Sequence, residues 1–175
     1  MDKLSAFSSE AFNFKGLVTQ NEFPNANHVH DLILNRLENV DASLSKAAFY
    51  HFETPGKMLR AKMAIQSASL AEIDTSISLL WAAAVEVLHN ASLIHDDICD
   101  GDKQRRGRSS IWVKFGQDTA LTLGDWLIAL SFELASEAAE MSNTPRLVGI
   151  LARHMATTTA GQAMEFRWDS TQSWD

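Results

Sequence analysis

The stretch LIHDDICDGDKQRRGRSS, residues 93–110, places charges of both signs directly after an apolar run. Four aspartates lie within the seven positions from Asp96 to Asp102, and four basic residues follow within the next six positions. The preceding residues 77–94 are mostly apolar, which is typical of a helix buried nearly all round. Charge beside such a helix is costly unless it meets a counter-charge or an open cavity. The stretch therefore predicts a functional site at the end of a central helix.

The composition favours one helical domain. The chain has 175 residues, of which 46% are hydrophobic and 21% charged, so residues 1–175 suit a single domain with a real core. Three prolines and eight glycines leave room for long, uninterrupted helices. We find no strand-like alternation and no repeat. The sequence predicts an all-α fold with at least five helices.

Charge and cysteine content exclude several classes of protein. The net charge of −7 argues against a nucleic-acid partner. A single cysteine, Cys99, excludes an internal disulfide and suits a reducing compartment. No signal-peptide pattern opens the chain, and the longest apolar run, residues 79–85, is shorter than the roughly 18 residues of a transmembrane segment. We expect a cytoplasmic protein without a transmembrane segment.

Apolar spacing and cap residues place the helices. Apolar residues recur at helical spacing over 28–44, and a second helix follows the break at 54–56. Asp74 or Thr75 caps the central helix, which runs on to residue 94 and the aspartates. Further helices are expected from about 118 to 141 and from Pro145 onward, with Pro145 in the first turn. Residues 1–25 lack a sustained period and are expected to form a flexible or docking arm.

Asp96, Asp97 and Asp100 form the pattern Asp-Asp-x-x-Asp. On a helix, Asp96 and Asp100 share a face with His89 and Ser92. A solvated acidic helix end is the alternative without function. Calcium is disfavoured because Ile98 and Gly107 occupy loop positions that need oxygen ligands, and zinc because there is no second cysteine. Closely spaced carboxylates suit Mg²⁺ bound together with substrate phosphates.

Two basic pairs complement the aspartates. Arg105 and Arg106 follow Asp100 closely enough to fold back towards it, and a guanidinium binds phosphate oxygens in a fork. Lys57 and Arg60 form a second pair at the start of the second helix, where cations oppose the helix dipole. Metal and arginine together would hold a diphosphate.

These residues resemble the trans-isoprenyl diphosphate synthases, or polyprenyl synthetases, over roughly residues 50–170. The resemblance rests on an ordered series of motifs: Gly56-Lys57-x-Leu59-Arg60, Glu86-x-x-His89, Ser92 to Asp100, Arg105-Arg106-Gly107, Phe115-Gly116, Gly124-Asp125 and Gly161-Gln162. An isolated Asp-Asp-x-x-Asp is weak evidence. Its spacing to Arg-Arg-Gly, with Gly-Lys-x-x-Arg upstream, is specific.

The resemblance implies a helical bundle around a central cavity and a Mg²⁺-dependent prenyltransferase. An allylic diphosphate would bind through Mg²⁺ held by Asp96, Asp97 and Asp100, with Arg105 as a further catalytic residue on its phosphates. Isopentenyl diphosphate would bind residues at the other basic positions, namely Lys57, Arg60, His89 and Arg106, and Gln162 is a further substrate-binding residue. The small residues Ala91 and Ser92, one turn before the aspartates, would line the chain-length pocket and favour products of twenty carbons or more.

The sequence departs from the family pattern in two places. Glu165 follows Gln162 where the family commonly has aspartate, and the second aspartate-rich motif and catalytic lysine of the family are absent. We therefore expect the N-terminal portion of a synthase, incomplete at its C-terminus, which would associate as a homodimer and whose activity would depend on the missing second motif. Two alternatives stay open: a terpene cyclase of the same fold, or a non-catalytic partner subunit of a two-chain synthase.

Overall fold

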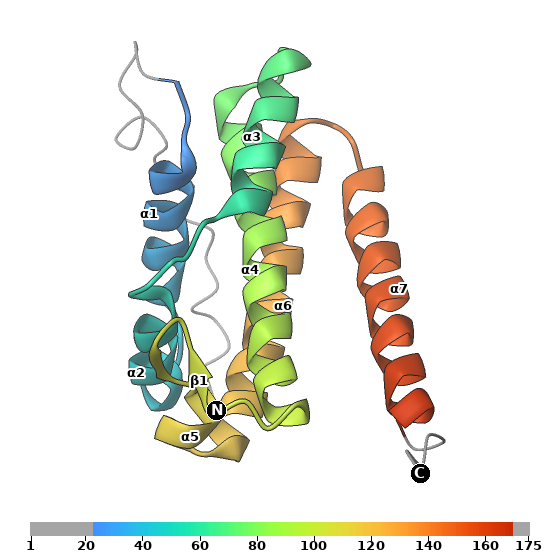
Figure 1. Ribbon diagram of the computed structural model, residues 1–175. Helices are drawn as coiled ribbons and strands as arrows, with labels where there is room; N and C mark the ends of the chain where they lie inside the picture. Colours follow the sequence, from blue (N-terminus) through green and yellow to red (C-terminus); the bar gives the residue numbers. More distant parts are fainter. Residues whose placement is uncertain (1–22, 170–175) are drawn as a thin grey trace, which may run out of the picture.

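The computed structural model describes residues 23–169, and its fold there is helical, as expected (Figure 1). The predicted N-terminal arm lies largely outside the described residues. In chain order the elements are α1 (Ala26–Leu37), α2 (Ala42–Phe52), α3 (Leu59–Leu70), α4 (Thr75–Cys99), β1 (Gln104–Arg105), β2 (Arg108–Ser109), α5 (Ile111–Phe115), α6 (Gln117–Met141) and α7 (Arg146–Asp169).

Helices α4 and α6 form the centre of the fold. They lie side by side along their length, with α1, α2 and α3 on one side and α7 packed against α6 on the other (Figure 1). The core includes Leu79, Leu80 and Val87 of α4 and Leu123 and Leu127 of α6, each without solvent exposure. Because α4 is enclosed by several helices, its C-terminal end is held firmly where the aspartates follow.

The apolar composition of α4 is also that of a membrane-spanning helix. By length and composition alone, α4 is long and apolar enough to span a membrane, with a mean hydropathy of 1.5 over an 18-residue window. The uninterrupted apolar run at residues 79–85 had been too short to predict this. Of that window, 61% is buried inside the protein itself. A helix covered by neighbours on most sides needs this composition to fill the core.

The prediction of one continuous helix over residues 28–44 is wrong. The chain leaves the helix after Leu37, and Asp41 starts α2, its Oδ1 accepting a hydrogen bond of 2.9 Å from the Ser43 amide. An aspartate that satisfies a free first-turn amide begins a new helix. Val40 and Leu44 kept the helical period across the break because both are buried in the same core.

The loop after the aspartates contains a hairpin that the sequence analysis did not predict. Strands β1 and β2 are antiparallel, with Gln104 opposite Ser109 and Arg105 opposite Arg108. The two residues between them, Arg106 and Gly107, have φ values of 55° and 76°. Positive φ at both central positions is the geometry of tight two-residue hairpins. Strands of two residues are too short to show alternation in the sequence.

Gly124 of α6 lies directly against the His95 side chain of α4, and its replacement tests this packing. A Cβ atom at Gly124 would lie 2.2 Å from Nε2 of His95 and 2.6 Å from its Cδ2. Gly124→Ala must therefore displace the His95 ring, and we expect overpacking to lower the free energy of unfolding by about 1–3 kcal/mol. Chemical denaturation followed by circular dichroism measures this change.

Gly149→Ala in α7 is the matched control, because its Cβ would come no closer than 3.7 Å to Arg153 Nη1. Replacing this helical glycine should leave stability unchanged or raise it by up to about 1 kcal/mol. Equal effects of the two substitutions would contradict the close packing at Gly124.

Candidate active site

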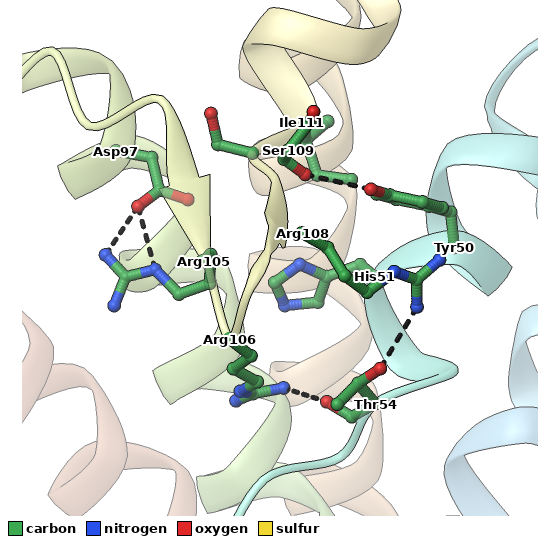
Figure 2. A pocket seen from close by; sticks show the side chains of 10 residues that line it. Tyr50, His51, Thr54, Asp97, Arg105, Arg106, Arg108, Ser109 and Ile111 are labelled. Atoms are coloured by element: carbon green, nitrogen blue, oxygen red, sulfur yellow. Dashed lines mark hydrogen bonds and ion pairs between the residues drawn. The ribbon is translucent and has the colours of Figure 1, made fainter.

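The end of α4 and the hairpin meet in a buried ion pair. Asp97 is 2% exposed, and its Oδ1 accepts hydrogen bonds from Nε of Arg105 at 2.8 Å and from Nη2 of the same guanidinium (Figure 2). Asp102 lies farther away, 3.8 Å from Arg105 Nη2. The hydrogen bond to Asp97 raises the pKa of Arg105 above its ordinary value. Asp97 therefore holds Arg105 in a fixed position and is itself neutralised by it.

Within residues 23–169, no arginine is hydrogen-bonded to the carboxylate of Asp96 or Asp100 as Arg105 is to that of Asp97. Asp96 is half-buried, and Asp100 is exposed as the last residue of the helix cap, with its amide donating to the Asp96 carbonyl oxygen at 2.8 Å. Burial raises the pKa of the Asp96 carboxyl, and the negative charge of Asp100 raises it further. This accumulation of negative charge is what a bound cation would relieve.

The three motif aspartates do not gather around one point. Among residues 23–169, no group of three His, Cys, Asp or Glu side chains lies close enough together to hold a metal ion. Asp97 faces Arg105 (Figure 2), whereas Asp96 lies near enough to Asp100 for the negative charge of Asp100 to raise its pKa. Mg²⁺ commonly uses one or two carboxylates together with substrate phosphates, so this pair of oxygen donors fits it.

Arg106 reaches the loop before α3. Its Nη1 donates to the carbonyl oxygen of Thr54 (Figure 2), and its Nη2 lies 3.4 Å from Asn90 Oδ1. Gly56, at φ 72°, allows this approach, because a Cβ there would lie 2.9 Å from Arg106 Nε. The guanidinium is thereby packed directly against the residue that precedes Lys57.

The remaining predicted cations lie around this loop. Lys57 is exposed just before α3, and Arg60 is exposed in its first turn. His89 is half-buried on α4, where burial lowers its pKa to about 4, helped by the positive charges of Arg60, Arg106 and then Arg105. His89 is therefore neutral near pH 7. The charges of Arg60, Arg105 and Arg106, which the sequence motifs predicted to act together, all lower the pKa of His89.

His51 is a site residue that no sequence motif predicted. It is 8% exposed, its Nε2 lies 3.0 Å from Asn90 Oδ1, and burial lowers its pKa to about 4. His51 opens onto a small pocket between α2, the hairpin and α4 (Figure 2). The residues around it are Tyr50, His51, Thr54, Asp97, Arg105, Arg106, Arg108, Ser109, Ser110 and Ile111. The one signal in the sequence was a histidine on the apolar face of α2.

The other predicted residues lie apart from the hairpin. Ala91 is fully buried in the hydrophobic core, whereas Ser92 is half-buried and donates a hydrogen bond of 2.8 Å to the His89 carbonyl oxygen. Ser92 lies one turn before Asp96 on the same face of α4. Gln162 is half-buried on α7, which packs against α6, and it does not line the pocket at the hairpin.

Known proteins share both the sequence and the fold. The polyprenyl synthetase family model matches residues 41–175. A geranylgeranyl diphosphate synthase of Saccharolobus solfataricus is 35% identical over 147 residues, which are 82% of this chain and 44% of that protein. The chain thus spans less than half the length of this relative.

Solved structures of polyprenyl synthases share the fold of this chain. A geranylgeranyl pyrophosphate synthetase from the archaeon Geoglobus acetivorans superposes with a TM-score of 0.76 at 32% identity, over 84% of this chain and 49% of that one. A polyprenyl synthase from Caulobacter crescentus, solved with calcium and isoprenyl diphosphate, gives 0.73 at 33% identity, over 80% and 42%. Members of the family thus bind a divalent metal with a diphosphate compound.

The helical order, the aspartate motif followed by the arginine pair, and these matches lead to one conclusion. This chain belongs to the polyprenyl synthetase family and has the isoprenoid synthase fold, of which it covers about the N-terminal half.

Proposed function

We propose that the chain contributes the aspartate-motif side of a prenyltransferase site, which joins an allylic prenyl diphosphate to isopentenyl diphosphate. The observation that carries the proposal is the proximity of Asp96 to Asp100 and Arg105 at the end of α4, with Arg106 next to Arg105 in the hairpin. An arrangement of metal-binding carboxylates beside arginines suits a diphosphate, which needs charge neutralisation on several oxygens.

The allylic diphosphate would bind at the end of α4. Asp96 and Asp100 would hold Mg²⁺, which, when bound, withdraws charge from the leaving diphosphate. Arg105 uses Nε and Nη2 on Asp97, so its Nη1 is the atom we assign to the phosphate oxygens. Because Asp97 fixes the guanidinium beforehand, little side-chain entropy is lost on binding.

Isopentenyl diphosphate would bind at the loop before α3. Lys57 and Arg60 are exposed there, and Arg106 is packed against the same loop. His89, neutral because of its lowered pKa, would donate a hydrogen bond to a phosphate oxygen without adding charge.

The chemistry then follows from the two binding positions. The allylic C–O bond breaks, and its electrons leave with the diphosphate. The double bond of isopentenyl diphosphate attacks the resulting carbocation and forms the new C–C bond, and a proton passes from the adjacent carbon to the released diphosphate. Half-exposed apolar side chains along α4, Trp81, Val85 and Leu88, would exclude water from the cation.

The first test is incorporation of labelled isopentenyl diphosphate into extractable prenyl product. Geranyl, farnesyl or geranylgeranyl diphosphate is supplied in turn with Mg²⁺, and with EDTA as control. Asp96→Ala removes one of the two proposed metal ligands, so we expect turnover to fall at least about a hundredfold. Asp118→Ala, which removes an exposed acid in the first turn of α6, should leave turnover unchanged. Product formed equally in EDTA, or by Asp96→Ala, would reject the metal assignment.

Product length tests the position of Ser92. Ser92→Phe places a bulky ring one turn before Asp96, so we expect shorter products by thin-layer chromatography and a nearly unchanged melting temperature. Ala91→Phe is the comparison: Ala91 is fully buried, so overpacking should cost about 1–3 kcal/mol of stability. Long products from Ser92→Phe would exclude Ser92 from the pocket wall.

The low pKa of His89 gives a pH-dependent test. A bound diphosphate offsets the positive charge of Arg60 and Arg106, so it should raise the pKa of His89 from about 4. Binding then takes up a proton, and affinity should rise as the pH falls from 7 to 5. Calorimetric titration of inorganic diphosphate should show a larger rise for the wild type than for His89→Gln, in which protonation of the diphosphate itself is unchanged. The same pH dependence in both proteins would place His89 outside the site.

A further inference from the structure

Glu86 is a buried acid that the proposed chemistry does not use. It lies in the middle of α4 and is 3% exposed. Its Oε2 accepts a hydrogen bond of 3.1 Å from the backbone amide of Ala61, which belongs to the first turn of the neighbouring α3. A carboxylate is buried at such cost only when fixed partners compensate it.

Helix α3 depends on this contact because its own start is poorly capped. Met58 occupies the N-cap position with φ 45° and ψ 43°. In the described structure its side chain makes no capping hydrogen bond. The first amides of a helix need acceptors, and negative charge is favourable beside them. Glu86 therefore supplies from another helix the acceptor that Met58 lacks.

The same carboxylate is linked to Arg106 through Asn90. Asn90 Nδ2 donates to the Glu86 carbonyl oxygen at 2.8 Å and lies 3.4 Å from Glu86 Oε1. This orientation turns Asn90 Oδ1 towards Arg106 Nη2 at 3.4 Å and His51 Nε2 at 3.0 Å. Since Oδ1 is an acceptor, Nε2 of His51 carries the hydrogen.

Arg106 closes the network on the loop. Its Nη1 donates to the Thr54 carbonyl oxygen, and its guanidinium packs against Gly56. Burial lowers the pKa of Arg106, and the negative charge of Glu86 acts in the opposite direction by favouring the charged guanidinium. The start of α3, the middle of α4 and the hairpin are thus joined through Glu86 and Asn90.

We propose that Glu86 is a positioning residue for the isopentenyl diphosphate subsite, an assignment that rests on the proposed function. It touches no substrate. It holds the first turn of α3, with Lys57 and Arg60, at a set distance from Arg106, so that the cations are arranged before the ligand arrives. Preorganised cations bind a diphosphate more tightly than mobile ones.

The position of Glu86 gives this role a specific signature. Asp96 lies ten residues later on α4, about 15 Å along the helix. The metal and Arg105 side of the site should therefore be little affected when Glu86 is changed. Loss of general stability would weaken both sides, whereas loss of positioning weakens the α3 side.

The experiment measures two properties of the whole chain. Calorimetric titration with inorganic diphosphate and with isopentenyl diphosphate, both without Mg²⁺, reports on the cation cluster. Hydrogen exchange over residues 59–63 reports on the start of α3. The variants are Glu86→Ala, Glu86→Gln, which keeps an oxygen acceptor, and Lys57→Ala as a direct loss of one cation.

Glu137→Ala is the control for stability. It removes a paired acid of α6, whose carboxylate accepts hydrogen bonds of 2.7 and 2.6 Å from Arg36 of α1, away from α3. It should lower the melting temperature without changing diphosphate affinity or exchange at 59–63.

We expect Glu86→Ala to weaken both ligands about tenfold to hundredfold and to speed exchange at residues 59–63, with Glu86→Gln recovering most of both. Wild-type affinity and exchange in Glu86→Ala would overturn the inference, as would an equal loss in Glu137→Ala. If the wild type binds neither ligand, the proposed function fails. Hydrogen exchange then decides the inference by itself. Unchanged protection of residues 59–63 in Glu86→Ala rejects it, and a loss of protection confined to these residues leaves Glu86 as the cap of α3.

Discussion

Asp97 is buried at the end of a helix that is otherwise built for the core, and Arg105 returns to it from the hairpin. Much of the site's arrangement depends on this ion pair, because it fixes the hairpin on α4 and aims Arg105 at the same time. Removing one partner of a buried ion pair typically costs about 3–5 kcal/mol, since the other charge is left without compensation. The first turn after α4 is therefore not free to move away from the aspartates.

The aspartates of one motif consequently differ in their roles. The carboxylate of Asp97 is paired with Arg105, whereas Asp96 and Asp100 retain excess negative charge that suits a cation. The motif was predicted to hold Mg²⁺ through all three aspartates, and the structure places one of them, Asp97, in an ion pair with Arg105. The difference arises because consecutive residues on a helix point in directions about 100° apart.

A similar division holds on the basic side. Lys57 and Arg60 are exposed and available to a ligand, while Arg106 is packed against Gly56 and hydrogen-bonded to Thr54. The negative charge of Glu86 favours the charged form of Arg106, and its Oε2 accepts a hydrogen bond from the Ala61 amide in the first turn of α3. The chain belongs to the polyprenyl synthetase family and covers less than half the length of its curated relative from Saccharolobus solfataricus.

The sequence by itself determined the helical class, a cap at Asp74 or Thr75, a new helix close to Pro145 and the residues of the charged motif, because composition, apolar period and capping are local properties. It misjudged residues 28–44, where two helices share one buried face, and it missed a hairpin too short to show alternation. Only the tertiary structure decided that Asp97 pairs with Arg105, that Glu86 caps α3, and that His51 meets Asn90. These contacts join residues 8 to 39 positions apart, and packing in three dimensions, rather than local periodicity, chooses the partners.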